Sequence, residues 1–420
     1  MTKPSIFYIN KTKVVLFPIK NVRSIEINIT IKCGSWYEIG ERWGIFHFLE
    51  HMILQGTKNL PSSEKISEFA KENGIYYNAF TNGTKINIPL NIPDLSLNQG
   101  LKMLEEIVFN PLISKEKIKN ELGAINQEFL SKWDRPETRF FRKIDKHIFG
   151  KNHIYIRDGL GQIDFIKNIS SSDLKKIHQQ YFQPQNMIIT IVGNIKNKPE
   201  LIKKLTKIFN KHPNTFKSKI KYPLITPSSQ QTLIYQDKPN QENITLIWIL
   251  EKNKKNNRLK KISNIIFNNL FGNSIDSLLF KIFRLKYGLV YGIKSSISNY
   301  KNCSFFEISC QIDPTNRQKF LEIFKKELKN IFSQINEKMF KRTIKYLNYQ
   351  ELIVYDSVKE ISNLITNESF LYKKIFLPED YIDLSKKINF KKTLLYFKEK
   401  ITWENKYLFI MTSANSNPNP

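Results

Sequence analysis

Two histidines and a glutamate stand within five consecutive residues of the N-terminal half, as His47, Glu50 and His51. Residues three and four apart lie on one face of a helix, so these side chains would project together from a helical segment. Two imidazoles one turn apart can hold one metal ion, and the order H-x-x-E-H is a known zinc-binding arrangement. The plainer alternative is that one histidine packs in the core and Glu50 is solvated. With only six histidines in 420 residues, chance would give this pattern with odds of about one in a few hundred, so it favours a metal site that still needs a third ligand.

Two further acids, Glu121 and Glu128, fall in a stretch that predicts a long helix from about residue 114 to 133. The apolar stripe of this helix consists of Ile118, Leu122, Ile125 and Phe129. At about 100° per residue, both acids lie on one edge of the stripe. If a neighbouring element covers that edge, both carboxylates must be paired, hydrogen-bonded or metal-bound, because burying one alone costs several kcal/mol. Otherwise both stay in water, and periodicity by itself slightly favours this second alternative.

The length and composition indicate a two-domain protein of a reducing compartment. A chain of 420 residues is too long for one ordinary core, and a hydrophobic content of 41% suffices for folding. The sequence shows no apolar run of about 18 residues and no leader pattern, which predicts neither a membrane span nor export. Cys33, Cys303 and Cys310 lack metal-type spacing and are interpreted as small buried residues. Together these observations predict a cytoplasmic protein.

The net charge of +28 raises the question of a nucleic-acid or acidic-membrane partner. Against such a partner, the basic residues are mostly lysines spread along the whole chain beside many Asn, Ile and Phe residues. A nucleic-acid surface requires clustered basic charge. We therefore expect no nucleic acid and no membrane as partner, and we interpret the charge as a compositional bias.

The order of predicted elements in the first half recurs in the second. A strand at 13–17 and an alternating strand at 25–33, which would bury one face, precede the histidine helix. In the second half, strands near 232–235 and at 243–250 precede a helix at 258–270. That helix contains asparagines and no histidine: Asn264, Asn268 and Asn269. The second half is therefore predicted to be a degenerate repeat without metal.

The predicted boundaries are a metal-binding domain at 1–212, a linker rich in Pro, Ser and Lys at 213–230, and the degenerate repeat at 231–420. In the first domain, residues 75–92 predict a hairpin around an Asn-Gly turn. In the second, residues 336–366 predict one continuous helical stretch.

The stretch Gly44-Ile45-Phe46-His47-Phe48-Leu49-Glu50-His51-Met52, followed by Gly56-Thr57, resembles the zinc peptidases related to pitrilysin, insulin-degrading enzyme and the mitochondrial processing peptidase. The third zinc ligand of that family is a glutamate about 77 positions after the second histidine, and here this position is Glu128. The family's companion acid, seven residues earlier, matches Glu121. The resemblance implies that His47, His51 and Glu128 hold Zn²⁺, that Glu50 is the general base, and that Glu121 supports a ligand.

The resemblance extends to segments outside the motif. Gly34-Ser35-Trp36-Tyr37-Glu38 is similar to the loop before the zinc helix. Asn78, Ala79, Phe80 and Thr81 are similar to the edge strand that pairs with the substrate. Arg284 and Tyr291 stand at the spacing of an arginine and a tyrosine that donate hydrogen bonds to the substrate carbonyl or the developing oxyanion. Without the resemblance, these last two would be an ordinary surface arginine and a core tyrosine.

The same resemblance implies a fold, an activity and an assembly. The fold would be α+β, with two homologous domains that are each a mainly antiparallel sheet packed with helices and that form half of a clamshell. The activity would be zinc-dependent endopeptidase cleavage of extended peptides or unfolded segments inside a closed chamber. Because one chain carries both the zinc residues and the Arg–Tyr pair, a homodimer is the simplest assembly, with a heterodimer of related subunits as the alternative. A catalytically silent scaffold of the same fold is the competing function, although the glycine-rich loop of the non-catalytic processing-peptidase partner is not seen.

Overall fold

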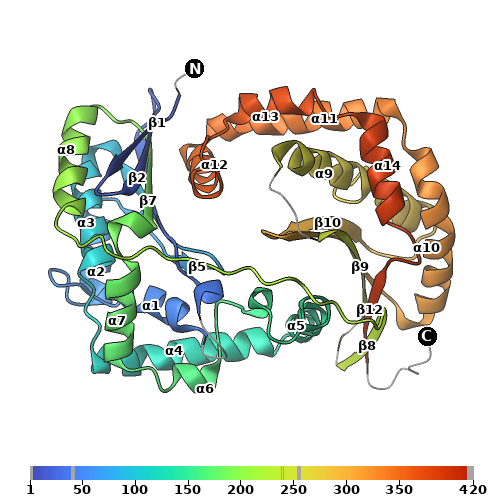
Figure 1. The fold of residues 1–420 in the computed structure, drawn as a ribbon, viewed down its shortest axis with the longest axis horizontal. Helices are drawn as coiled ribbons and strands as arrows, with labels where there is room; N and C mark the ends of the chain where they lie inside the picture. The colour runs from blue at the N-terminus through green and yellow to red at the C-terminus, as the bar shows by residue number, and fades with distance from the viewer. Residues whose placement is uncertain (1–2, 39–42, 238, 240, 253–256, 414–420) are drawn as a thin grey trace. The chain divides into compact units, whose positions relative to one another are not determined.

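The structure is a computed structural model that describes residues 3–38, 43–237, 239, 241–252 and 257–413. The chain folds into two compact units, and each unit draws on three stretches of the sequence. The first unit comprises Met1–Lys132, Arg157–Lys221 and Ile353–Leu377, and the second comprises Trp133–Ile156, Tyr222–Leu352 and Pro378–Pro420. Each half of the chain therefore contributes a segment to the unit built mainly from the other half (Figure 1). The predicted division at residues 212 and 230 follows the sequence repeat instead and stays a prediction.

The first unit is built on a seven-stranded sheet. Its strands are β1 (Ser5–Ile9), β2 (Thr12–Pro18), β3 (Ser24–Ile31), β4 (Tyr76–Tyr77), β5 (Phe80–Thr81), β6 (Ile86–Pro93) and β7 (Met187–Gly193). They lie in the order β1-β2-β7-β3-β6-β4, and β5 also pairs with β6. The pair β2–β7 is parallel and the other pairs are antiparallel. Strands β4, β5 and β6 confirm the hairpin predicted at 75–92.

Helices cover both faces of this sheet. They are α1 (Ile45–Ile53), α2 (Ser63–Glu72), α3 (Leu97–Phe109), α4 (Lys115–Trp133), α6 (Ile163–Ile166), α7 (Ser171–Tyr181), α8 (Lys198–Phe209) and α12 (Val358–Leu371). The fully buried Ile25, Ile27 and Ile29 of β3 share one core with apolar side chains of α1, α2, α3, α4, α7 and α8. Helix α12 packs against β3 and β7 on the opposite face.

The alternation in β3 predicts one buried face, and this prediction is wrong. Glu26, Asn28 and Thr30, on the other face, are also buried, because α12 covers them. Asn28 Nδ2 donates a hydrogen bond of 2.9 Å to Ser362 Oγ of α12, and Asn28 Oδ1 accepts one of 3.0 Å from Asn87 Nδ2. Polar side chains that are hydrogen-bonded in this way can be buried at little cost, so a polar sequence does not by itself indicate exposure.

The second unit contains a five-stranded sheet with the same connectivity as the first. Its strands are β8 (Thr232–Asp237), β9 (Glu242–Lys252), β10 (Ile293–Asn299), β11 (Cys303–Ile312) and β12 (Tyr407–Ser413). The order β8-β12-β9-β11 repeats the order β2-β7-β3-β6, and β8–β12 is the one parallel pair, as β2–β7 is in the first sheet. The α+β fold with two mainly antiparallel, helix-packed sheets is therefore confirmed.

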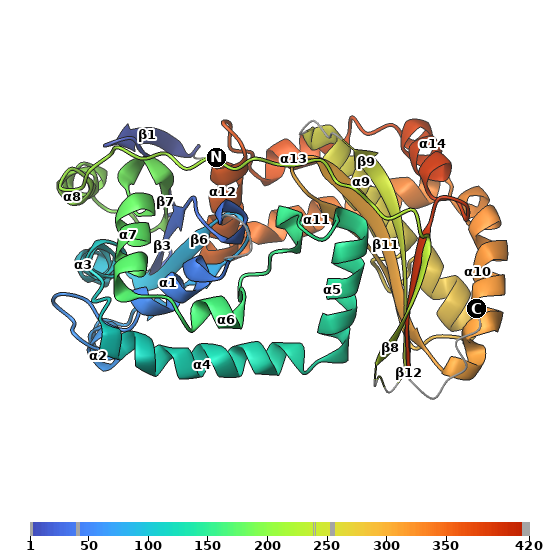
Figure 2. The same cartoon turned by 60° about the horizontal axis from the view of Figure 1, so that its bottom comes forward.

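The helices of the second unit come from both halves of the chain. They are α5 (Pro136–Phe149), α9 (Arg258–Phe271), a π-helical segment (Phe280–Lys286), α10 (Arg317–Ile331), α11 (Glu337–Ile353), α13 (Pro378–Ser385) and α14 (Phe390–Lys400). Short 3-10 turns lie at Ser35–Tyr37, Asp94–Ser96, Ile154–Ile156, Pro184–Asn186, Pro314–Asn316, Phe332–Gln334 and Val354–Asp356. Helix α5 lies beside the second sheet (Figure 2). Its side chains contact that sheet: Phe140 stacks on Tyr235, and His147 meets Phe409 edge-on.

The prediction of one helical stretch at 336–366 is wrong. Helix α11, which belongs to the second unit up to Leu352, ends at Ile353, and α12 begins at Val358, in the first unit. Ser357 caps α12 by accepting a hydrogen bond of 3.3 Å from the Glu360 backbone N–H. Its S-x-x-E spacing is the signal that would have located this helix start. Strands β10 and β11 also lie in a region for which the sequence analysis named no element.

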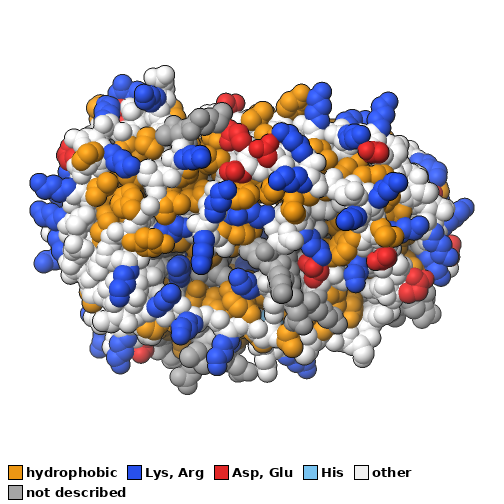
Figure 3. Space-filling view, turned by 45° about the horizontal axis from the view of Figure 1, so that its top comes forward, with side chains coloured by type: hydrophobic (Ala, Val, Ile, Leu, Met, Phe, Trp, Pro, Cys, Tyr) orange, Lys and Arg blue, Asp and Glu red, His pale blue; other side chains and the backbone are white. Residues whose placement is uncertain are grey.

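The composition also leads to predictions about the cysteines, the charge and membrane spans. Cys33, Cys303 and Cys310 are buried and none of them forms a disulfide, which confirms their interpretation as core residues. None of the described helices combines the length and the apolar character that crossing a bilayer requires. Lys and Arg side chains are scattered over the face drawn in Figure 3, between apolar and neutral surface.

Candidate active site

The start of α1 is fixed by a buried carboxylate. Glu38 Oε2 accepts a hydrogen bond of 2.6 Å from the Gly44 backbone N–H, and Oε1 accepts one of 3.0 Å from Phe46 N–H. Gly44 has a φ of +117°, and a Cβ there would lie 2.9 Å from Gly161 Cα, so glycine is required. Burial raises the pKa of Glu38 to about 7, while these N–H groups and Arg157 act in the opposite direction. The resemblance placed Glu38 in the loop before the helix, but sequence reasoning missed its capping role.

The end of α1 is fixed by the Gly-Thr pair of the motif. Thr57 Oγ1 donates a hydrogen bond of 2.8 Å to the buried Glu106 Oε2, on α3. Gly56 has a φ of +140°, and a Cβ there would lie 2.5 Å from the Pro61 carbonyl oxygen. The chain can therefore turn sharply after α1 only with glycine at this position.

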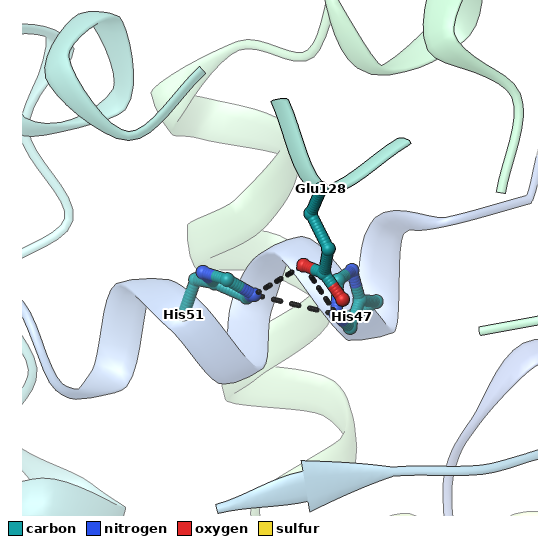
Figure 4. A group of neighbouring side chains, drawn as sticks. All are labelled: His47, His51 and Glu128. Atoms are coloured by element: carbon teal, nitrogen blue, oxygen red, sulfur yellow. Dashed lines mark hydrogen bonds and ion pairs between the residues drawn. The ribbon is translucent and has the colours of Figure 1, made fainter. Parts of the chain in front are cut away.

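Three donor atoms converge beside α1. His47 Nε2 and His51 Nε2 are 3.3 Å apart, and Glu128 Oε2, from α4, lies 3.6 Å and 3.5 Å from them (Figure 4). A zinc ion bound tetrahedrally at about 2.0–2.1 Å keeps its ligand atoms about 3.3 Å apart, so the spacing fits such an ion. Among the described residues, His47, His51 and Glu128 form the group of side chains whose ligand atoms lie close enough together to hold one metal ion.

The two histidines differ in their electrostatic surroundings. Burial, together with His51 and Lys132, lowers the pKa of His47 to about 3, so His47 stays neutral in the physiological range. For His51, burial also acts to lower the pKa, but the hydrogen bond that it donates to Glu121 and the charges of Glu50, Glu121 and Glu128 outweigh burial and raise the pKa. A neutral imidazole is the form that binds metal. His47 is therefore already in the binding form, whereas at His51 a metal ion must compete with a proton.

Glu121 lies behind His51 on the side away from the other ligands. Its Oε1 is 2.7 Å from His51 Nδ1. A carboxylate can only accept, so Nδ1 carries the hydrogen and Nε2 presents its lone pair toward His47 and Glu128. Glu121 is buried, whereas the Glu128 side chain is 48% exposed. The helix edge predicted to carry both acids is thus covered at Glu121 by α1, and the two acids occupy different environments.

Glu50 and the predicted substrate strand meet on the same side of the site. Glu50 is 9% exposed, and burial raises its pKa while Thr81 and His51 lower it. Strand β5 lies against α1 and pairs with β6 through Phe80 and Thr81. Among the described strands, β5 has no partner on its other edge, and Phe80 is 45% exposed there. Asn78 and Ala79 precede it: Asn78 N–H donates to the Pro89 carbonyl, and Ala79 is buried.

Arg284 and Tyr291 are brought together within the second unit. The Arg284 guanidinium lies 5.1 Å from the centre of the Tyr291 ring, and Arg284 Nη1 donates a 3.2 Å hydrogen bond to the Val290 carbonyl. Tyr291 is 83% exposed, so it is not a core tyrosine, and it lines a cavity of about 810 Å³ with Asn243, among others. Their role toward a substrate rests on the resemblance and stays a prediction.

In the second unit, the described residues at the place that corresponds to α1 offer no group of metal ligands. Helix α9 follows β9 as α1 follows β3. Asn264, Asn268 and Asn269 line a cavity of about 160 Å³ there, without a His, Cys, Asp or Glu in its wall. That this repeat binds no metal stays a prediction.

Comparison with known proteins assigns the family. The model described as "Insulinase (Peptidase family M16)" matches residues 13–156, and the model "Peptidase M16 inactive domain" matches residues 168–347. An uncharacterized zinc protease of Rickettsia bellii is 24% identical over 378 residues, which cover 89% of each chain.

Solved structures share the fold at low identity. The crystal structure of a protease from Helicobacter pylori superposes with a TM-score of 0.84 at 19% identity, over 98% of this chain and 99% of that one. A peptidase M16 inactive domain from Pseudomonas fluorescens gives a TM-score of 0.87 at 13% identity, with both chains fully covered. Two models of one family thus match most of the chain, and the first match contains the cluster of His47 and His51 on α1 with Glu128 on α4. The chain belongs to peptidase family M16, the insulinase and pitrilysin family.

Proposed function

We propose that the protein is a zinc-dependent endopeptidase that cleaves extended peptides or unfolded segments. The observation that carries the proposal is the convergence of His47 Nε2, His51 Nε2 and Glu128 Oε2 at 3.3–3.6 Å, with Glu50 on the same helix. When bound there, zinc would supply Lewis-acid activation of a water molecule and of the scissile carbonyl. The relatives named zinc proteases support this assignment.

The remaining steps fall to side chains and backbone of this chain. Glu50 would take the proton of the attacking water and deliver it to the leaving amine. Glu121 would hold His51 in the tautomer that leaves Nε2 free. The open edge of β5 would pair with an extended peptide, since backbone hydrogen bonding to a strand edge recognises peptides without regard to sequence. Arg284 and Tyr291 would donate hydrogen bonds to the substrate carbonyl.

The assembly and location are proposed with the activity. A homodimer in which each subunit completes the other's site is the simplest arrangement of one zinc set and one Arg–Tyr pair per chain, and a heterodimer is the alternative. A closed peptide chamber and a cytoplasmic location complete the proposal. Neither a nucleic acid nor a membrane is proposed as a partner.

Replacement of the base separates catalysis from metal binding. The Glu50→Gln variant is expected to bind zinc at nearly one ion per chain and to cleave a fluorogenic peptide at least about 100-fold more slowly, because the water proton has no acceptor. Wild-type protein should lose activity in chelator and regain it with zinc. Undiminished turnover by the variant would remove Glu50 from the mechanism.

A catalytically silent scaffold is the second candidate, favoured by the match of residues 168–347 to a model described as an inactive domain. The same assay decides between the two. A wild-type protein that binds zinc stoichiometrically but cleaves no member of a peptide library would support the scaffold.

A further inference from the structure

A glutamine just past α1 contacts the supporting carboxylate of the zinc site. Gln55 stands two residues after the last residue of α1, Ile53. Its Nε2 donates a hydrogen bond of 2.5 Å to Glu121 Oε2. The other oxygen of that carboxylate, Oε1, faces His51 Nδ1 at 2.7 Å. Both oxygens of Glu121 are therefore occupied, one by the metal ligand and one by Gln55.

Gln55 is itself held by α4. Lys117 Nζ donates a hydrogen bond of 2.6 Å to the Gln55 carbonyl oxygen and one of 2.9 Å to the Pro61 carbonyl oxygen. Lys117 and Glu121 are one helical turn apart, so they lie on one face of α4. This face of α4 thus makes two hydrogen bonds to Gln55, one from Lys117 to its backbone carbonyl and one from its side-chain amide to Glu121.

Because Glu121 is buried, the loss of its hydrogen bond from Gln55 would not be made good by water. The Glu121 side chain is 11% exposed, so water is a poor substitute for a lost partner. Without the amide of Gln55, Oε2 would lack its donor, and the carboxylate could rotate away from His51. Partners that orient a metal-bound histidine are commonly worth about 10–100-fold in metal affinity.

We infer that Gln55 is a positioning residue for the zinc site, which acts through Glu121 on His51 and is itself held by Lys117. The amide fixes the rotation of the Glu121 carboxylate, the carboxylate fixes the His51 ring, and the ring presents Nε2 beside His47 and Glu128. This inference rests on the zinc site of the proposed function, and its test measures metal binding directly.

The test compares Gln55→Met with wild type by competition of the metal-free protein with a chromophoric zinc chelator. Methionine keeps the length of the side chain but has no amide, so zinc affinity is expected to fall about 10-fold. The absorption spectrum of the Co²⁺-substituted protein should also change, because the His51 ring is less well oriented. Gln162 is also half-buried in the first unit, and among the described residues its side chain makes no hydrogen bond to His47, His51 or Glu128, so Gln162→Met is the matched control and should bind zinc as wild type does.

A double-mutant cycle separates positioning from general loosening. If Gln55 acts through Glu121, Gln55→Met should cause no further loss of zinc affinity in a Glu121→Met background. Gln55→Glu serves as a second variant. It places a second carboxylate against that of Glu121, and it should therefore bind zinc more weakly than Gln55→Met. Thermal unfolding in chelator shows whether each variant folds.

Each outcome bears on one proposal. Wild-type zinc affinity in both Gln55 variants, or a loss that simply adds to that of Glu121→Met, would overturn the positioning role while leaving the zinc site in place. A wild-type protein that binds no zinc would overturn the proposed function itself.

Discussion

The residues around α1 show how one helix is adjusted for chemistry by side chains outside it. Glu38 holds the first N–H groups of the helix, and Glu121 holds the ring of its second histidine. The histidine pair and Glu50 could be found from spacing, because a helix places residues three and four apart on one face. Glu38 could not be found in this way, because a capping contact from a residue outside the helix leaves no periodic signal.

Glu38 provides a prediction of pH dependence. Its pKa in the folded protein is raised to about 7, above the ordinary value of 4.5. Between these values the folded state keeps a proton that the unfolded state has released, so unfolding free energy falls as pH rises from about 4.5 to about 7. The Glu38→Gln variant cannot titrate here. Relative to wild type, it should therefore gain stability across this range, by about 3 kcal/mol at most.

Urea unfolding of both proteins at pH 5 and pH 8, in chelator, measures this difference. Glu105→Gln is the control, because Glu105 is paired at the surface with Lys211. An unchanged gap between Glu38→Gln and wild type at the two pH values would show that Glu38 does not bind its proton more tightly in the folded state.

At the scale of elements, α12 is the least expected part of the first unit. The chain leaves the second unit after α11, and Ser357 starts a new helix that covers the polar face of β3. The interface contains the Asn28–Ser362 hydrogen bond and a contact from Lys85 Nζ to Asn367 Oδ1 at 2.9 Å. The fit of α12 therefore depends on its start position and register, which the cap helps to set.

The Ser357→Ala variant should lose about 1 kcal/mol of unfolding free energy, because the Glu360 N–H loses its acceptor. Ser357→Asp, which keeps a cap acceptor, should remain close to wild type. Hydrogen exchange followed by mass spectrometry should show faster exchange in α12 than in α7, which retains its own Ser170 cap. Equal exchange in α12 of the alanine and aspartate variants would argue against a role for the cap.

At the scale of the whole molecule, the two units repeat one strand order but carry different chemistry. The first has His47, His51 and Glu128, whereas the second has asparagines on α9 and the Arg284–Tyr291 pair. This division of residues motivates the proposed homodimer, in which the zinc residues of one subunit work with the Arg–Tyr pair of the other.

Mixing two inactive variants tests this arrangement. Glu50→Gln lacks the base and Arg284→Ala lacks the donor, so each homodimer should be inactive. Random reassortment makes half of the dimers mixed, with one intact site of two, so about a quarter of wild-type peptidase activity is expected. Activity should depend on prior subunit exchange, and mixing Glu50→Gln with wild type provides the reference. No recovery after proven exchange would show that each chain completes its own site or uses another partner.

The sequence alone determined the motif helix, the helix with its two acids, the succession of two strands and a helix that opens each repeat, and, through the resemblance, Glu128. These features are local or periodic, so residue spacing carries them. The tertiary structure decided which acid is buried, that Glu38 and Gln55 contact the site, that α12 belongs to the first unit, and that β3 is buried on both faces. The physical reason is that each of these depends on which distant segment covers a given face, and a polar side chain is compatible with either water or a buried hydrogen-bond partner.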